Sequence, residues 1–376
     1  MTLHGHRRGV AGVRFSPDGE WIASCSADAT LKIWSARTGA LAHTLEGHLA
    51  GISALAWSPD SAVLASGADD KLIRLWDART GACLPCSPLR GHHNYVYSLA
   101  FSPKGNILVS GSYDEAVFVW DVRTARLMRR LPAHSDPVSG VDFVRDGTLV
   151  ASCASDGLIR IWDTATGQCL KTLVHEDNAP VTSVRFSPNG KFVLAATLDG
   201  CVRLWNYVEG RCVKTYQGHR NERFSIGTAF GTYRAEKQVI AAMKVKEGET
   251  GFSIEEGKED VEESPTWAFA ACGSEDGRVV LWDVSSKEIL QELHGHTGVV
   301  LGVDVAPDGR TMATCGADRT IKIWRPGPLP VAPEDMNGHE NVDKGDVGVP
   351  TTEAQALERN GSAGIQEQML VAHEDG

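Results

Sequence analysis

The sequence predicts an all-β protein, a seven-bladed β-propeller, and three regular spacings along its 376 residues support this prediction. Tryptophans that follow an aliphatic residue recur every 42–44 residues, with one gap of 77, at Trp34, Trp76, Trp120, Trp162, Trp205, Trp282 and Trp324. An aspartate precedes each tryptophan by six residues, and a histidine precedes five of these aspartates by 22 residues. Repeats of this length, made of short strands and turns, are typical of propeller blades.

The first repeat shows how each unit is divided into strands. A turn with the sequence SPDG follows the first run of alternating polar and apolar residues, and a second turn occupies 27–29. Alternation between such turns indicates half-buried strands. The four predicted strands of this repeat are Val10–Phe15, Trp21–Ser26, Thr30–Trp34 and Ala40–Leu45.

The chain ends and the long gap complete the predicted domain organisation. His219 precedes Asp276 by 57 residues instead of 22, so blade six holds an insertion of 35 residues. We place it within 231–266 and expect disorder, because this stretch is rich in Glu, Lys and Gly. We expect the propeller to occupy 1–325 and a disordered acidic tail to occupy 326–376. Prolines follow Trp324 and cannot donate ladder hydrogen bonds, so Met1–Leu3 must supply the last outer strand.

The charge balance argues against direct binding to nucleic acids. The chain has 37 basic and 48 acidic residues, a net charge of −11. The segments 231–266 and 325–376 contain all of this excess, so the rest of the chain is neutral. A protein that holds phosphates needs a basic surface, which this composition does not supply.

Nine cysteines without framework spacing favour a reducing compartment, and we expect no secretory leader and no membrane span. Cys83 and Cys86 form a single C-x-x-C pair, and no second pair lies at zinc spacing. Cys25, Cys153 and Cys315 are expected in the core between blades. Because no phosphate-binding loop is present either, the sequence indicates no metal and no cofactor.

The Gly-His, Asp and Trp-Asp elements, as at Trp76-Asp77 and Trp120-Asp121, resemble WD40 repeats. The resemblance implies that a His, a Ser or Thr, an Asp and the Trp form a hydrogen-bonded tetrad inside each blade. The sets expected to be complete are Ser26, His6, Asp28 and Trp34 in blade one, Ser112, His92, Asp114 and Trp120 in blade three, and Ser274, His219, Asp276 and Trp282 in blade six. A hydrolase triad would occur only once, so we assign these groups a structural role and expect no enzyme activity.

Four blades depart from this tetrad pattern. Asp177 stands in blade five where the histidine is expected. Ala68, Ala154 and Gly316 stand at the assumed serine position of blades two, four and seven. These four blades are therefore expected to be internally looser.

Several longer strings resemble one WD-repeat family, the propeller subunit of COMPASS or MLL-type complexes that methylate lysine 4 of histone H3. They are DGEWIAS (18–24), LPAHSDPVS (131–139), IWDTATGQCLKTL (161–173), SPNGKFVLAATLD (187–199) and TYQGH (215–219). The resemblance implies a nuclear, non-catalytic scaffold that binds the SET-domain methyltransferase subunit and a second propeller subunit, with the histone H3 tail as a further candidate partner. The alternatives are a scaffold of another nuclear complex, in splicing or transcription, and a ubiquitin-ligase substrate receptor.

The same resemblance implies an arginine-peptide pocket at the mouth of the central channel. In the family two aromatic rings sandwich the arginine, whereas here Tyr97 supplies one ring and Gly227 occupies the place of the other. An altered or weakened arginine site is therefore expected. The matching positions are Ala27, Ser53, Asp69, Tyr97, Tyr113, Ser139, Ser155, Thr182, Phe224, Ser225, Gly227 and Leu301.

A second implied surface is a partner-peptide cleft on the opposite face, at blades five and six. Its matching residues are Asn189, Phe192, Leu204 and Phe230. Leu204 and Phe230 could instead be ordinary strand residues. The insertion directly follows Phe230, so it could gate this cleft, or it could be intronic sequence translated by mistake.

Overall fold

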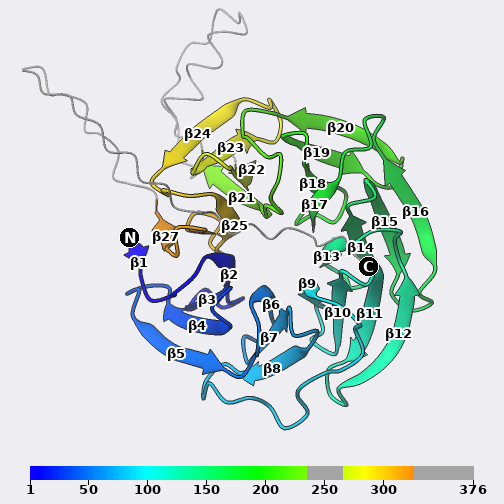
Figure 1. The fold of residues 1–376 in the computed structure, drawn as a ribbon. Coiled ribbons are helices and arrows are strands. Elements are labelled where there is room, and N and C mark those ends of the chain that lie inside the picture. The colour runs from blue at the N-terminus through cyan, green and yellow to red at the C-terminus, as the bar shows by residue number, and fades with distance from the viewer. Residues whose placement is uncertain (235–265, 326–376) are drawn as a thin grey trace, which may run out of the picture. The chain divides into compact units, whose positions relative to one another are not determined.

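Seven antiparallel sheets form a ring in the computed structural model, which describes residues 1–234 and 266–325 (Figure 1). Every element in these residues is a strand. The chain separates into two units, Met1–Gly327, which holds all seven blades, and Pro328–Gly376. The second unit lies outside the described residues, as does the predicted acidic tail from 326 onward.

The strands of each blade follow one another along the chain. Blade one holds β2 (Val10–Phe15), β3 (Trp21–Ser26), β4 (Thr30–Ser35) and β5 (Leu41–Glu46). Blade two holds β6 (Ile52–Trp57), β7 (Val63–Ala68) and β8 (Ile73–Asp77). Blade three holds β9 (Val96–Phe101), β10 (Ile107–Ser112), β11 (Ala116–Asp121) and β12 (Arg126–Pro132). Blade four holds β13 (Val138–Phe143), β14 (Leu149–Ala154), β15 (Leu158–Asp163) and β16 (Cys169–Val174).

The remaining blades repeat this order. Blade five holds β17 (Val181–Phe186), β18 (Val193–Thr197), β19 (Cys201–Asn206) and β20 (Arg211–Tyr216). Blade six holds β21 (Thr228–Arg234), β22 (Thr266–Gly273), β23 (Arg278–Asp283) and β24 (Ile289–His294). Blade seven holds β25 (Val300–Val305), β26 (Met312–Gly316), β27 (Ile321–Trp324) and β1 (Thr2–Leu3). This confirms the predicted seven-bladed, all-β architecture.

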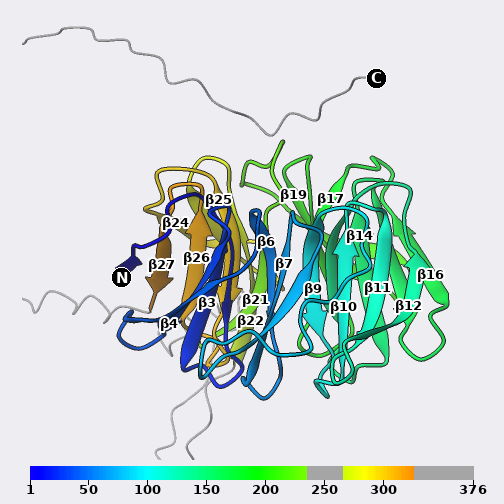
Figure 2. The same ribbon diagram turned by 60° about the horizontal axis from the view of Figure 1, so that its bottom comes forward.

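Burial changes from the inside of each blade to its outer edge. The second strand is almost wholly buried, as in β3 and β10, because neighbouring blades cover both of its faces. The outer strand is mostly exposed, as in β12. Figure 2 shows the sheets from the side, with the strands running between the two faces of the ring. Turns between strands therefore lie on one face or the other, where they can meet partners.

The N-terminus closes the ring as predicted. β1 pairs with β27 in the register Thr2↔Lys322 and Leu3↔Ile321. The backbone N–H of Ile323 donates to the Met1 oxygen (2.8 Å), and the Met1 amino group donates to the Ile323 oxygen (2.9 Å). The two ends of the described propeller thus hold each other in one sheet.

Blade two is an exception to the predicted four strands, because its sheet contains only β6, β7 and β8. The segment where an outer strand was expected forms two isolated bridges to β8, Trp76↔Cys83 and Ile73↔Leu89. Pro85 and Pro88 lie between them, and prolines cannot donate to a ladder.

The predicted insertion is shorter at both ends than expected. Gly231–Arg234 and Thr266 belong to paired strands, since β21 and β22 remain in register as far as Arg234↔Thr266. The intervening residues 235–265 lie outside the described part of the chain. No helix among the described residues is long and apolar enough to cross a membrane.

Candidate protein-interaction surfaces

The tetrad of blade three shows how the polar groups inside a blade are connected. The His92 ring lies 2.9 Å from the Asp114 carboxylate through Nδ1 and 2.7 Å from the Ser110 hydroxyl through Nε2. The Trp120 indole N–H donates to the same hydroxyl (2.8 Å). The hydroxyl therefore links the imidazole to the indole, and the carboxylate fixes the other side of the imidazole.

The serine predicted for this tetrad is not the one that forms it. Ser110 and Ser24 occupy the central position in blades three and one, and the predicted Ser112 and Ser26 do not. Ser26 instead donates to the Gly9 oxygen and accepts from the Asp28 backbone N–H. Residues two apart on a strand lie on the same face, so sequence spacing alone could not separate the two candidates.

The same shift of two residues overturns the expectation that blades two, four and seven are looser. Ser66, Ser152 and Thr314 supply the hydroxyl there, and each bonds to the histidine and to the tryptophan of its blade. Ala68, Ala154 and Gly316 occupy the neighbouring position, which the tetrad does not use. Blades one, two, three, four and seven therefore contain closed tetrads.

Blade five replaces the tetrad with an arginine network. Arg203 is only 3% exposed, and its guanidinium donates to Thr197 Oγ1, to both oxygens of Asp199 and to Asp177 (3.3 Å). Asp177, which replaces the histidine, thus accepts from an arginine. Loss of the histidine is compensated within the blade.

Blade six contains no closed tetrad, contrary to the prediction. Neither ring nitrogen of the buried His219 has a partner among the described residues. Cys272 stands where the other blades place the hydroxyl, and the Trp282 indole donates to the Gln217 carbonyl (2.8 Å). Asp276 is bound by Arg278, and Ser274 by the backbone of Arg220.

The closed tetrads are unsuited to catalysis. Their histidine side chains are at most 1% exposed, so no substrate can reach them. Burial lowers the pKa of His6 and His134, partly offset by their aspartates. Burial raises the pKa of Asp28 and Asp114, but hydrogen bonds to the charged carboxylates outweigh it and lower both pKa values to about 2. The donors are Thr30 and the Arg7 backbone N–H at Asp28, and His92 at Asp114. These groups form permanent internal contacts.

All twelve predicted pocket residues lie at one end of the strands. Four directly follow a second strand: Ala27, Asp69, Tyr113 and Ser155. Five are the second residue of an inner strand: Ser53, Tyr97, Ser139, Thr182 and Leu301. Phe224, Ser225 and Gly227 lie in the segment before β21.

The inner-strand positions share a backbone feature. The pairing register shifts at Ser53, Tyr97 and Ser139, which marks a bulge in each blade. The same shift occurs at Thr182 and Leu301. Bulges redirect side chains at the ends of sheets. The repeated bulge therefore builds a ring of variable residues at the end of the inner strands.

An aromatic cluster occupies this ring at blade three. The Tyr97 ring centroid lies 6.3 Å from that of Tyr95 and 6.0 Å from that of Tyr113. Burial raises the pKa of Tyr97 to about 12, with a smaller contribution from the negative charge of Asp69. Sequence reasoning missed Tyr95, although three tyrosines within 19 residues were a visible signal. Aromatic faces beside a carboxylate suit a cationic side chain.

The side of the ring across from this cluster is more open. A side chain at Gly227 would have its nearest contact at the Leu301 carbonyl, 3.6 Å from the new Cβ. Nearby Phe224 is 41% exposed, and Ser225 donates to the Thr182 carbonyl (2.9 Å). The glycine therefore leaves space that an aromatic ring could fill.

The four residues predicted for the blade five and six cleft lie at the other ends of the strands. Phe192 and Phe230 are partly buried and pack on the same apolar cluster, which includes Leu204. Leu204 is only 4% exposed, so it supports the surface from below. Asn189 lies exposed in the turn between β17 and β18, where it accepts the Lys191 backbone N–H. Two aromatic edges and a polar rim are thus available to a peptide.

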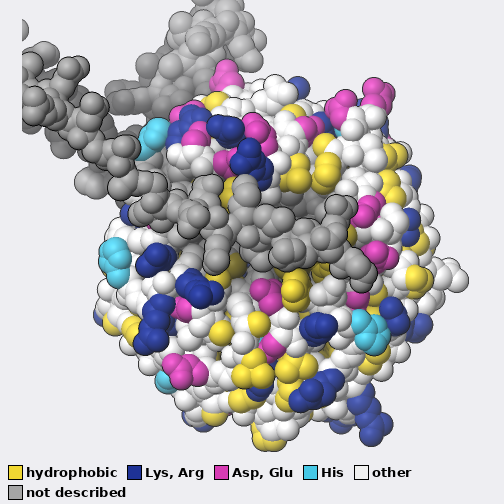
Figure 3. All heavy atoms as spheres, viewed as in Figure 1, with side chains coloured by type: hydrophobic (Ala, Val, Ile, Leu, Met, Phe, Trp, Pro, Cys, Tyr) yellow, Lys and Arg dark blue, Asp and Glu magenta, His cyan; other side chains and the backbone are white. Residues whose placement is uncertain are grey.

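Charge on the visible face and metal ligands among the described residues indicate no further site. In Figure 3, Lys and Arg side chains alternate with Asp and Glu on the visible face and form no single basic patch. In the part of the chain that the structure describes, no three His, Cys, Asp or Glu side chains are grouped to hold a metal ion.

Comparisons with known proteins agree with this architecture. Ubiquitin homeostasis protein lub1 of Schizosaccharomyces pombe is 47% identical over 57 residues, which are 15% of this chain and 8% of that protein. DDB1- and CUL4-associated factor 13 of Dictyostelium discoideum is 42% identical over 55 residues, 15% of this chain and 12% of that protein. The β subunit of a guanine nucleotide-binding protein of Saccharomyces cerevisiae is 47% identical over 57 residues, which are 15% of this chain and 13% of that protein.

These relatives share little more than one repeat with this chain, which matches no more than 13% of any of the three. They support the repeat type and leave the partners open. A family model described as the WDR5 beta-propeller domain matches residues 2–325, and on this match the chain belongs to the WDR5-type family of WD40 propellers.

Proposed function

We propose that this chain is the non-catalytic scaffold of a COMPASS-type complex that methylates lysine 4 of histone H3. In this proposal the channel mouth binds an arginine-containing segment of the SET-domain subunit or of the histone H3 tail. The blade five and six cleft binds the second propeller subunit. The family match over residues 2–325 is the observation that carries the proposal.

The chemistry of the channel mouth supports an arginine ligand. A guanidinium can stack on Tyr97, and its donors can reach toward Asp69, which is half-buried and also accepts from Ser53 (3.2 Å). Stacking on one aromatic face contributes about 0.5–2 kcal/mol. Because Gly227 supplies no opposing ring, the Tyr95 and Tyr113 side of the site must contribute more of the affinity.

Purification of the tagged chain from its own cells, followed by mass spectrometry, tests this proposal. Recovery of a SET-domain methyltransferase and a second propeller protein is the expected result. Phe230→Ala should release the second propeller protein more completely than Tyr97→Ala releases the methyltransferase, since truncating a buried aromatic anchor costs about 2 kcal/mol or more. If Tyr97→Ala dissociates the complex and Phe230→Ala leaves it intact, this ranking is wrong.

Because Phe230 also packs on the core cluster, its variant needs a folding control. Asn189→Asp keeps the side-chain oxygen that accepts from the Ser187 hydroxyl and the Lys191 backbone N–H and removes only the amide donor of the exposed rim, so it should weaken the same partner without lowering the melting temperature. Fluorescence microscopy of the tagged chain tests the proposed nuclear localisation.

A ubiquitin-ligase substrate receptor is the second candidate, favoured by the match to a DDB1- and CUL4-associated factor. The same purification separates the candidates. Recovery of a cullin and its adaptor without a methyltransferase would support the second candidate and contradict the first.

A further inference from the structure

A pocket of about 350 Å³ lies between blades seven and one, among the turns at the strand ends opposite the channel mouth. It is separate from the channel mouth and from the blade five and six cleft. Three turns and the residue after β27 form its walls. The lining residues are Phe15, Asp18, Gly19, Ala36, Arg37, Ala306, Pro307, Asp308, Thr311 and Arg325.

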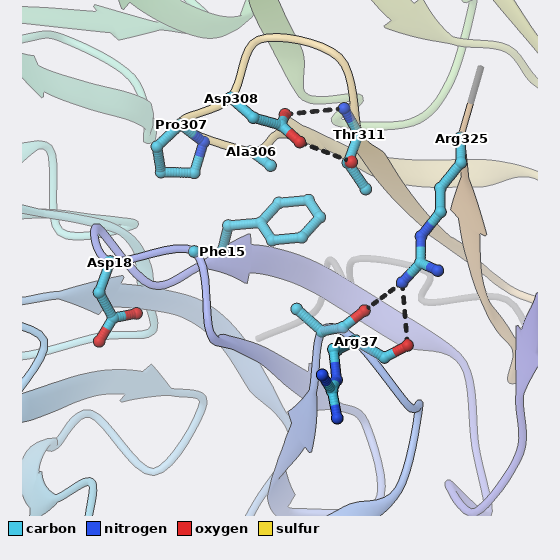
Figure 4. A pocket seen from close by; sticks show the side chains of 10 residues that line it. Phe15, Asp18, Arg37, Ala306, Pro307, Asp308, Thr311 and Arg325 are labelled. Atoms are coloured by element: carbon cyan, nitrogen blue, oxygen red, sulfur yellow. Dashed lines mark hydrogen bonds between the residues drawn. The ribbon is translucent and has the colours of Figure 1, made fainter.

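The floor of the pocket is apolar and fixed in place. Phe15, Ala36 and Ala306 are each 7% exposed, and Figure 4 shows the Phe15 ring between the two opposing walls. The Phe15 backbone N–H donates to Asp304 Oδ2 of blade seven (2.8 Å). An aliphatic side chain of a ligand could rest on this floor.

Arg325 supplies a pre-positioned cation on one wall. Its Nη2 donates to the carbonyls of Ala36 (2.8 Å) and Arg37 (3.0 Å), as Figure 4 shows. Within residues 1–234 and 266–325, its Nε and Nη1 have no hydrogen-bond partner. Two anchoring bonds thus hold the guanidinium, and its other donors have no partner in the described part of the chain. Arg37, which also lines the pocket, adds a second positive charge.

The two acidic residues of the pocket are already satisfied by their own turns. Asp308 accepts from the backbone N–H groups of Arg310 (2.8 Å) and Thr311 (2.9 Å) and from the Thr311 hydroxyl (2.8 Å). Asp18 accepts from Ser16 and from the Glu20 backbone N–H. These carboxylates shape the turns, and they make a phosphate dianion less favourable in the pocket than a single carboxylate.

We propose that this pocket binds a short peptide in which an aliphatic residue adjoins an Asp or Glu side chain. The aliphatic group rests on Phe15, and the carboxylate accepts hydrogen bonds from Arg325, with Arg37 adding charge attraction. Guanidinium groups pair with carboxylates through parallel hydrogen bonds, which gives the site directional selectivity. The proposal does not depend on which complex contains the chain.

Nuclear magnetic resonance of the full chain labelled with [15N]glycine tests this site directly. Gly19 lines the pocket and Gly309 directly follows the lining residue Asp308, whereas Gly190 reports on the blade five and six cleft. The probes are the peptide acetyl-Ala-Leu-Asp-Leu-Ala-amide and its Asp-to-Asn counterpart. The acidic peptide should shift the Gly19 and Gly309 amides, and the amide counterpart should bind about tenfold more weakly.

Matched variants assign the effect to the arginines. Because Arg37 is exposed, Arg37→Glu should leave the melting temperature of the chain unchanged. It should abolish the peptide-induced shifts of the Gly19 and Gly309 amides. Arg310→Glu, on the adjacent turn but outside the lining, should preserve them. Equal binding of the two peptides, or unchanged binding to Arg37→Glu, would overturn the proposal. Stronger shifts from inorganic phosphate would also overturn it and indicate a general anion site.

Discussion

Blades three and six both carry the histidine, the aspartate and the tryptophan of the tetrad at matching positions, yet only blade three connects them. In blade three the Ser110 hydroxyl joins His92 to Trp120, and Asp114 completes the chain of bonds. In blade six Cys272 replaces that serine, and His219 is buried without partners among the described residues. The hydroxyl at the centre of the tetrad therefore determines whether the buried histidine is hydrogen-bonded and stabilises its blade, or is left unpaired and destabilises it.

Asp114→Ala should produce the largest loss of stability. Asp114 accepts from His92 and from the backbone N–H groups of His93 and Ala116, so its loss leaves several donors unpaired. We expect the free energy of unfolding to fall by about 3 kcal/mol. Thermal and denaturant unfolding measure the effect, with Asp276→Ala of blade six as the matched control.

Asp276 is more exposed and is bound by Arg278, so we expect its removal to cost about 1 kcal/mol or less. Equal losses for the two aspartates would contradict the difference between the blades. Unchanged stability of Asp114→Ala together with loss of a hydrolytic activity would contradict the structural role of the tetrads.

Acid should destabilise blade six through His219. Burial lowers the pKa of His219 to about 4 from its ordinary 6.5, because its two nearby aspartates offset burial only in part. His219 of the unfolded chain therefore binds a proton below about pH 6.5, whereas His219 of the folded chain binds one only near pH 4. The free energy of unfolding therefore falls as the pH falls through this window. The loss should approach about 3 kcal/mol at the lower limit.

Unfolding measured between pH 7 and pH 4 tests this dependence. His219→Gln cannot titrate and should flatten the curve relative to the native chain, whereas His92→Gln should leave the His219 contribution in place. A native curve that coincides with that of His219→Gln would contradict the assignment.

Ser110→Ala and Ser112→Ala separate the two serines of β10. Ser110 interacts with two buried rings, so its loss should cost about 2 kcal/mol. Ser112 bonds only to the backbone, to the Asn94 oxygen and the Asp114 N–H, so its loss should lower the free energy of unfolding by about 1 kcal/mol. Thermal unfolding of the pair provides the comparison, and the reverse order would restore the serine chosen from the sequence.

The repeat spacing was sufficient to predict the ring, and the prolines after Trp324 predicted its closure by Met1–Leu3. The WD40 resemblance supplied the histidine, aspartate and tryptophan of the closed tetrads. It failed at details that depend on register. Ser24 and Ser26 share a face of β3, and only the positions of β4 and the histidine loop determine which hydroxyl reaches the indole. Tyr97 and the other channel-mouth positions were carried over from the family resemblance, and Tyr95, which lies outside that set, was overlooked although it stands two residues before Tyr97.

Cys272→Ser should have the smallest effect and the opposite sign. It places a hydroxyl at the position of Ser110 and offers His219 a partner, so we expect a gain of about 1 kcal/mol. Thermal unfolding should show a higher melting temperature, and Cys272→Ala, which supplies no hydroxyl, is the control. An equal change in both variants would show that packing, rather than the hydroxyl, is responsible.

Hydrogen exchange measured by mass spectrometry tests most directly whether the closed tetrad secures a blade. Amides of β23 (Arg278–Asp283) should exchange faster than those of the equivalent strand β11 (Ala116–Asp121), because opening blade six breaks fewer buried bonds. In Cys272→Ser the exchange of β23 should slow toward that of β11. Equal protection of the two strands in the native chain, together with no change in Cys272→Ser, would contradict the account.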